Sequence, residues 1–257
     1  AVHADAVFLS PAGAGAWQTL LSIYAFAFQI YFDFSGYTDI AIGLALLLGL
    51  RFPKNFDYPY AAASFQEFWR RWHMTLSRWL RDYLYISLGG NRYGPGRTMS
   101  NLMITMVLGG LWHGASWTFV IWGGLHGLFL AAERLVFSQW RWWRSTHWVL
   151  RLARTLIVFH LVCVAWVFFR APDFSAARIM FANLLLPYRA ADFSAAAPLA
   201  SLVFALFAAQ IAVAGRDLKA RISEAGGMPV GLLGACCGLL LIWFTPGKSV
   251  PFIYFQF

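Results

Sequence analysis

His73, His113 and His126 lie in or beside the apolar sequence that holds the longest uncharged run of the chain. An imidazole is neutral or charged near pH 7, so it accepts and returns a proton readily during a group transfer. Ionisable side chains in sequence that suits a membrane are candidates for a functional site by default. Residues 111–127 contain two of these histidines and are the stretch in which we expect the chemistry.

The sequence around His113 predicts an interrupted helix. No Asp, Glu, Lys or Arg occurs between Arg97 and Glu133, and this interval of about 35 residues corresponds to about 50 Å of helix. That length is too great for one membrane crossing and too small for two, so we predict a broken or re-entrant helix at residues 109–114. Irregular backbone at membrane depth needs surrounding protein or a watery cavity. His113 is therefore predicted to lie beside a cavity.

The second histidine of this stretch, His126, has a simpler interpretation. Gly123 and Gly127 flank it at the spacing that allows two helices to approach closely, which favours a packing role. His113 and His126 are thirteen residues apart and have no adjacent carboxylate. Metal-binding histidines are normally clustered with such ligands, so we predict no metal site.

His73 shares its helix face with Arg70 and Ser77. One interpretation is a polar face on a helix at the membrane surface. The other is that this face closes the cytoplasmic side of a cavity, with Arg70 available to bind an anionic acyl donor.

Two carboxylates, Asp33 and Asp39, lie between apolar runs in the segment around Ser35-Gly36. Serine and glycine together can interrupt a helix, so we expect an interruption here. Buried carboxylates need partners, and we expect these two to pair with arginines or to cap half-helices.

The elements that position these residues are helices in a membrane. Hydrophobic residues make up 60% of the 257-residue chain and charged residues 12%, against about 25% charged in a soluble domain. We predict an all-α, polytopic helical membrane bundle. The candidate spans are residues 17–31, 37–50, 98–132, 152–169, 198–214 and 230–244.

Residues 64–85 form a different kind of element. Apolar residues recur there at helical spacing opposite a polar face, which predicts an amphipathic helix at the membrane interface. Ser64 and Glu67 fit a capping box and mark the expected start of this helix.

The net charge of +9 is distributed in short loops between apolar runs, which argues against a nucleic-acid partner. Eight of the 20 basic residues fall within residues 51–97. Basic residues concentrate in cytoplasmic loops, so we predict that this segment faces the cytoplasm. No linker between domains is evident, and we expect a single membrane domain over residues 1–257.

Three long strings give a family resemblance: YFDFSGYTDIAIGLALLLGLRFPKNFDYPY from Tyr31, SFQEFWRRWHMTLSRWLRDYLYISLGGNR from Ser64 and LGGLWHGASWTFVIWGGLHG from Leu108. Together they resemble the membrane-bound O-acyltransferase family, and within it the bacterial branch that acetylates exopolysaccharides such as alginate. The core motifs cover residues 26–133, and residues 152–257 match mainly in hydropathy. Family members are usually longer, so we expect this chain to be a C-terminal portion.

The resemblance implies roles for the residues that match the family's motifs. His113 corresponds to the catalytic histidine and His73 to a second, supporting histidine. Arg70 and Ser77 are expected to bind the donor. The tryptophans near His113 are expected to form walls that exclude water: Trp112, Trp117 and Trp122.

The reaction that the resemblance implies is acetyl transfer from a cytoplasmic donor such as acetyl-CoA, across the bacterial inner membrane, towards hydroxyls of an exopolysaccharide. Membrane lipid and a periplasmic acetyltransferase are the expected partners, and no cofactor is expected to stay bound. One alternative is transfer of D-alanine to teichoic acid by a related enzyme. Another is a transporter or a non-catalytic assembly subunit, in which His113→Ala would preserve function.

Overall fold

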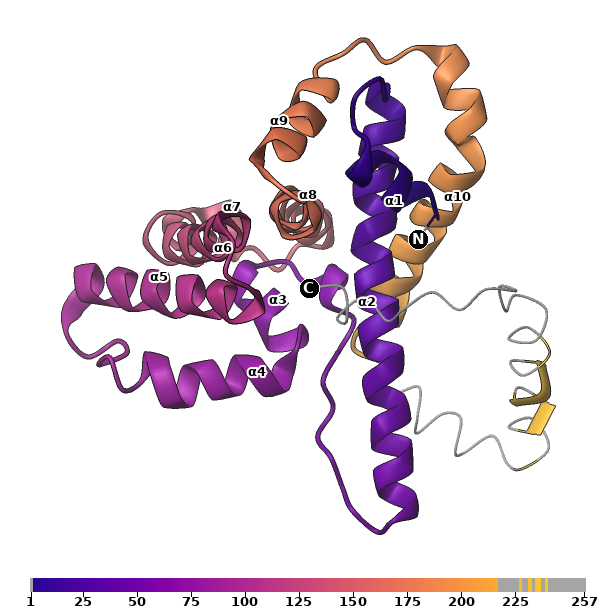
Figure 1. Cartoon of the computed structure of the whole chain (residues 1–257). Coiled ribbons are helices and arrows are strands. Elements are labelled where there is room, and N and C mark those ends of the chain that lie inside the picture. The colour runs from indigo at the N-terminus through magenta and orange to yellow at the C-terminus, as the bar shows by residue number, and fades with distance from the viewer. Residues whose placement is uncertain (1, 217–226, 228–230, 233, 237–238, 240–257) are drawn as a thin grey trace.

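A computed structural model describes residues 2–216 together with 227, 231–232, 234–236 and 239. The predicted all-α class is confirmed, because the elements of the described residues are all helical (Figure 1). In chain order the elements are α1 (Val2–Leu9), α2 (Ala16–Leu47), η1 (Pro59–Ala61), α3 (Phe65–Arg71), α4 (Met74–Trp79), η2 (Leu80–Tyr85), α5 (Gly94–His113), α6 (Trp117–Leu135), η3 (Phe137–Gln139), α7 (Arg141–Arg144), α8 (Trp148–Arg170), α9 (Phe174–Asn183) and α10 (Ala190–Val213).

The chain is a multi-pass membrane protein. Within the described residues, four helical segments are long and apolar enough to cross a membrane: Ala16–Leu47, Trp117–Gln139, Trp148–Arg170 and Ala196–Val213. The spans predicted at 152–169 and 198–214 correspond to α8 and α10, which confirms both. The span predicted at 230–244 lies outside the continuously described residues.

The predicted interruption of the first long helix was wrong. α2 runs without a break through Ser35 and Gly36, and the hydroxyl of Thr38 donates to the carbonyl oxygens of Phe34 and Ser35 at 3.1 and 3.0 Å. Serine and glycine lower helix stability by only about 1 kcal/mol or less each, which the surrounding apolar helix formers outweigh. Spans 17–31 and 37–50 are therefore one helix.

The expectation for the two carboxylates of α2 was also wrong. Asp33 and Asp39 do not cap half-helices, because the helix continues past both of them. In the described part of the chain, neither takes part in an ion pair with an arginine. Most of the buried residues of α2 lie in its N-terminal half, and its C-terminal half extends away from the other helices (Figure 1).

The amphipathic segment at residues 64–85 is interrupted rather than continuous. Its start is confirmed, because Ser64 Oγ accepts from the amide of Glu67 at 3.0 Å and Glu67 in turn accepts from the amide of Ala63 at 2.8 Å. α3 ends at Arg71, a new helix begins at Met74, and the last part is a wider π-helical turn, η2.

The long uncharged run forms a helical hairpin, as the broken-helix prediction required. α5 ends at His113 and α6 begins at Trp117, so the break falls at residues 114–116, at the C-terminal edge of the predicted interval. The helices are in close contact at Gly123, where a Cβ would lie 2.3 Å from the carbonyl oxygen of Met106, and at Gly127. The predicted close packing at these two glycines is confirmed.

Aromatic side chains dominate the core that joins the hairpin to the other helices. α8 lies near the centre of the molecule, next to α2 and α6 (Figure 1). Its Trp166 is 1% exposed, and the ring stacks on Trp122 of α6 at 5.9 Å and contacts Trp72 at 5.0 Å. This rigid layer holds the segment that carries His73 against the hairpin that carries His113.

Candidate active site

His73 lies at the break between α3 and α4, where its backbone adopts a left-handed conformation with φ of 40°. The amide of Met74 donates to the carbonyl oxygen of Asn55 at 2.9 Å. The side-chain oxygen of Asn55 accepts from the amide and the hydroxyl of Thr75 at 3.1 and 2.9 Å. A left-handed residue other than glycine is strained and persists only where its surroundings fix it. Asn55 therefore produces the break that presents His73.

Asn55 also sets the chemistry of the His73 ring. Its Oδ1 lies 3.3 Å from Nδ1 of His73 and can only accept, so the proton of the neutral imidazole belongs on Nδ1 and the lone pair on Nε2. Phe34 and Phe56 contact the ring with centroids 4.7 and 6.4 Å away. Burial lowers the pKa of His73 from 6.5 to about 4. At pH 7 this imidazole is therefore neutral and can accept a proton.

His113 is the last residue of α5, directly before the break in the hairpin. Its ring packs against buried aromatic rings, with centroids 5.3 Å from Trp122, 5.1 Å from Phe169 and 6.2 Å from Phe119. Such an apolar enclosure excludes water and strengthens electrostatic interactions inside it. The surroundings of His113 suit proton transfer in a water-poor site.

A series of aromatic contacts links the surroundings of His73 and His113, although the two residues are forty positions apart in the sequence. Phe56 contacts the ring of His73, and Trp122 contacts the ring of His113. Trp72 and Trp166 connect their surroundings by ring contacts. The roles that the resemblance gives to these two histidines stay a prediction.

A cavity of about 500 Å³ lies between α3, α4, η2 and the hairpin. It contains two of the residues predicted to bind a donor, Arg70 and Ser77. Its described lining includes four arginines and no carboxylate. Arg81 pairs with Asp82 at 2.7 Å beside the cavity, whereas a lining of guanidinium donors that itself holds no carboxylate favours anions, phosphates above all. The arginines that line it are Arg70, Arg78, Arg81 and Arg134.

The sequence reasoning missed part of this cavity. Arg134, at the end of α6, donates to the side-chain oxygen of Asn91 at 3.0 Å, and both residues line the cavity. Asn91 and Arg134 are 43 residues apart in the sequence. Their separation in sequence left no local signal, because only the return of α6 beside η2 brings them together.

The tryptophans predicted to enclose His113 differ in position. Trp122 is 2% exposed and contacts the His113 ring, as a wall residue would. Trp112 touches the same ring but is 63% exposed, and Trp117, the first residue of α6, is 73% exposed. In the described structure neither exposed tryptophan encloses the imidazole, because both lie on the outer side of the hairpin turn.

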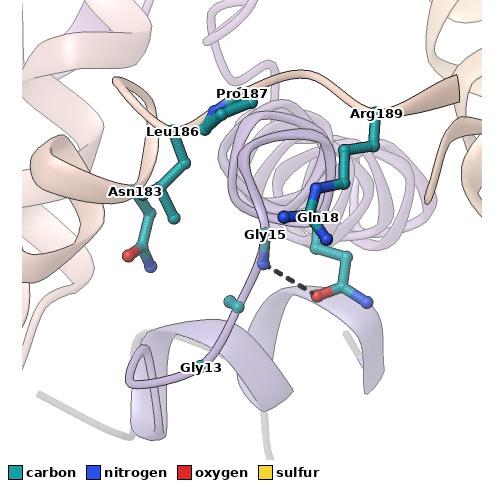
Figure 2. Close-up of a pocket in the computed structure, with 8 residues that line it drawn as sticks. Gly13, Gly15, Gln18, Asn183, Leu186, Pro187 and Arg189 are labelled. Carbon is teal, nitrogen blue, oxygen red and sulfur yellow. Dashed lines mark hydrogen bonds between the residues drawn. The ribbon is translucent and has the colours of Figure 1, made fainter.

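A second cavity, of about 400 Å³, lies at the N-terminal end of α2 and contains none of the predicted site residues (Figure 2). Gly13, Gly15 and Gln18 line it from the start of α2 and the residues just before it, and Asn183 and Arg189 line it from the end of α9 and the segment after it, with Arg189 beside Gln18. The amide of Gly15 donates to Oε1 of Gln18 at 3.1 Å, which satisfies one of the first amides of the helix. This arrangement is the cap of α2.

Comparison with known proteins gives the family. The model of the membrane-bound O-acyltransferase family matches residues 11–169, a region that includes α2, both histidines, the arginine-lined cavity and the hairpin. The chain belongs to this family. The resemblance of the three sequence strings is thereby confirmed.

Individual relatives of this chain differ in what their names say they modify. A probable alginate O-acetylase from Azotobacter vinelandii is 51% identical over 174 residues, which cover 68% of this chain and 33% of the relative. A peptidoglycan O-acetyltransferase from Helicobacter pylori is 48% identical over 63% of this chain and 30% of its own. A teichoic acid D-alanyltransferase from Bacillus subtilis is 32% identical over 60% of this chain and 42% of its own. The chain thus spans about a third of the length of the two acetylating relatives.

Proposed function

We propose that the complete protein to which this chain belongs is a membrane O-acetyltransferase that modifies an exopolysaccharide such as alginate. The observation that carries the proposal is the position of His73 and His113. Both lie in the region that matches the family, and a series of aromatic contacts through Trp72, Trp166 and Trp122 links their surroundings. The identities of 51% and 48% to two acetylating relatives, against 32% to a D-alanyltransferase, favour acetyl transfer over D-alanyl transfer.

The donor in this proposal is acetyl-CoA, which approaches from the cytoplasm. The arginine-lined cavity suits its phosphates, because guanidinium groups bind phosphate through paired hydrogen bonds. The segment that contributes most of these arginines, residues 51–97, is the segment predicted to face the cytoplasm. Arg70 and Ser77 are the donor-binding residues that the proposal names.

The catalytic base is His113. Neutral imidazole takes the proton of the acceptor hydroxyl while the hydroxyl oxygen attacks the carbonyl carbon of the thioester. The carbon–sulfur bond breaks, and the departing thiolate takes the proton back from His113, so an ester and a free thiol are formed. General-base assistance of this kind contributes about 10² to 10⁴ in rate.

His73 has a supporting role in this scheme. Its low pKa keeps it neutral beside His113, so it does not oppose the positive charge that develops on the base. A periplasmic acetyltransferase is the proposed partner that completes transfer to the sugar, and the bacterial inner membrane, with its lipid, is the proposed location.

The test compares acetylation of the polysaccharide by the full-length protein carrying His113→Ala, His73→Ala or neither. His160→Ala is the matched control, because His160 is an exposed histidine on α8 outside the site. We expect His113→Ala to abolish acetylation and His73→Ala to reduce it, with membrane insertion unchanged. Normal acetylation by a well-inserted His113→Ala protein would instead favour a transporter or assembly subunit.

A further inference from the structure

His126 is the histidine to which the sequence assigned a packing role, and its surroundings require more than packing. It is fully buried in α6, and neither ring nitrogen has a hydrogen-bond partner among the described residues. Rings enclose it on several sides, with centroids 5.0 Å away for Trp69, 5.0 Å for Trp122 and 6.5 Å for Trp166. A phenylalanine would fill the same space without burying two polar atoms.

The three tryptophans have the same unsatisfied polarity. The indole nitrogens of Trp69, Trp122 and Trp166 are buried and make no hydrogen bond in the part of the chain that the structure describes. The described residues contain ten such buried nitrogen and oxygen atoms, and five of them belong to this one group of four side chains. Buried polar groups in proteins are almost always hydrogen-bonded, to ordered water where no protein group is in reach. Five unpaired polar atoms in one group of side chains indicate that ordered water binds them.

This group of four side chains lies between the arginine-lined cavity and His113. Trp69 also lines the arginine-lined cavity, so solvent in that cavity borders the group directly. On the other side, Trp122 contacts the ring of His113 at 5.3 Å. His126 touches both tryptophans and lies between them in this series of contacts.

We propose that His126 is a positioning residue. Together with Trp69, Trp122 and Trp166 it binds buried water that enters from the arginine-lined cavity, and this hydrated group holds Trp122 against His113. Removal of the two nitrogens releases the water and loosens Trp122, so the base loses its orientation. The binding of water is independent of the proposed acetyl transfer, whereas the consequence for His113 rests on that function.

Hydroxyl-radical footprinting of the full-length wild-type protein tests the water. Radiolysis of bound water labels the side chains beside it, even where they are buried. Trp122 and Trp166 are 2% and 1% exposed, and the reference Trp143, outside the group, is 7% exposed. Exposure alone predicts more label on Trp143. We expect more hydroxyl-radical label on Trp122 and Trp166 than on Trp143. The reverse order would overturn the proposal, whatever the kinetics of the His126 variants show.

Kinetics of His126→Phe test the positioning role. Phenylalanine keeps an aromatic ring and removes both nitrogens, so a residue that only packs would tolerate it without loss of thermal stability or activity. We expect kcat for acetyl transfer to fall about tenfold or more, KM for acetyl-CoA to stay within about twofold, and His126→Gln to recover part of the loss. His160→Phe is the control.

The outcomes separate the two claims. Wild-type kcat in His126→Phe, or labelling of Trp122 and Trp166 below Trp143, overturns the positioning role. If wild-type protein transfers no acetyl group, the proposed function fails, while footprinting still decides whether the group is hydrated.

Discussion

Replacing Gly123 by alanine tests whether the hairpin contact holds His113 in place. A Cβ at this position would lie 2.3 Å from the carbonyl oxygen of Met106 and 3.0 Å from Cα of Val107. An ordinary contact begins at 3.4 Å, so α5 and α6 must separate by about 1 Å at this level. The opposing atoms belong to the backbone of α5, and no side-chain rotation relieves the overlap.

Gly124→Ala is the matched control for this substitution. It lies on the same helix, and its Cβ would meet nothing within 4 Å. Both variants gain about 1 kcal/mol of helix propensity. The difference between them therefore isolates the overlap with α5, and overpacking of this kind costs about 1–3 kcal/mol.

Thermal unfolding of the purified full-length protein and its acetyl transfer are the two measurements. We expect Gly123→Ala to melt at a lower temperature than Gly124→Ala. We also expect it to lose activity, because His113 ends the displaced helix and a shift of about 1 Å at a reacting group costs up to about 100-fold in rate. Equal melting temperatures and equal activity in the two variants would refute the reasoning.

Three further predictions concern Arg70 in the cavity, the pKa of His73 and the ion pairs that Glu67 of α3 makes with two arginines. Arg70→Gln raises KM for acetyl-CoA severalfold with little change in kcat, whereas Arg151→Gln, outside the cavity, leaves KM unchanged. Burial lowers the pKa of His73 to about 4, so as the pH falls the unfolded chain binds a proton on this imidazole before the folded protein does. The free energy of unfolding therefore decreases between about pH 6.5 and about pH 4. We expect the melting temperature of His73→Gln to fall less steeply over this range than that of the wild type, and equal slopes would contradict the prediction. Arg71 and Arg151 both bind Glu67, but the Arg71 side chain is 18% exposed and that of Arg151 51%. Because solvent weakens exposed ion pairs, we expect Arg71→Gln to lower the melting temperature more than Arg151→Gln. The reverse order of melting temperatures would contradict this prediction.

Several features of this protein followed from local sequence. Apolar runs of sufficient length identified α8 and α10, and the absence of charge from residue 98 to 132 required a break next to His113. Ser64 and Glu67 marked the start of α3 through hydrogen bonds between near neighbours. These features depend on composition, hydrophobic spacing and short-range hydrogen bonds, and all three can be read from the order of residues.

Tertiary structure decided where helices end inside apolar or amphipathic runs. Ser35-Gly36 resembles a helix break but remains helical, whereas the amphipathic pattern at His73 resembles a continuous helix but breaks. The difference is Asn55, whose backbone and side-chain oxygens bind the segment after His73 from outside the helix. Local propensities differ by about 1 kcal/mol per residue or less, so a few hydrogen bonds from a distant segment outweigh them.

In the candidate active site, too, some features were evident from the sequence and others only from the tertiary structure. The residue types that can do chemistry, and the candidate roles of His73 and His113, came from the sequence. The four arginines around one cavity, and the burial of Trp122 with exposure of Trp112, exist only once α6 has returned beside α3 and η2. A residue's neighbours across a helix interface depend on how whole helices pack, and no local pattern encodes that packing.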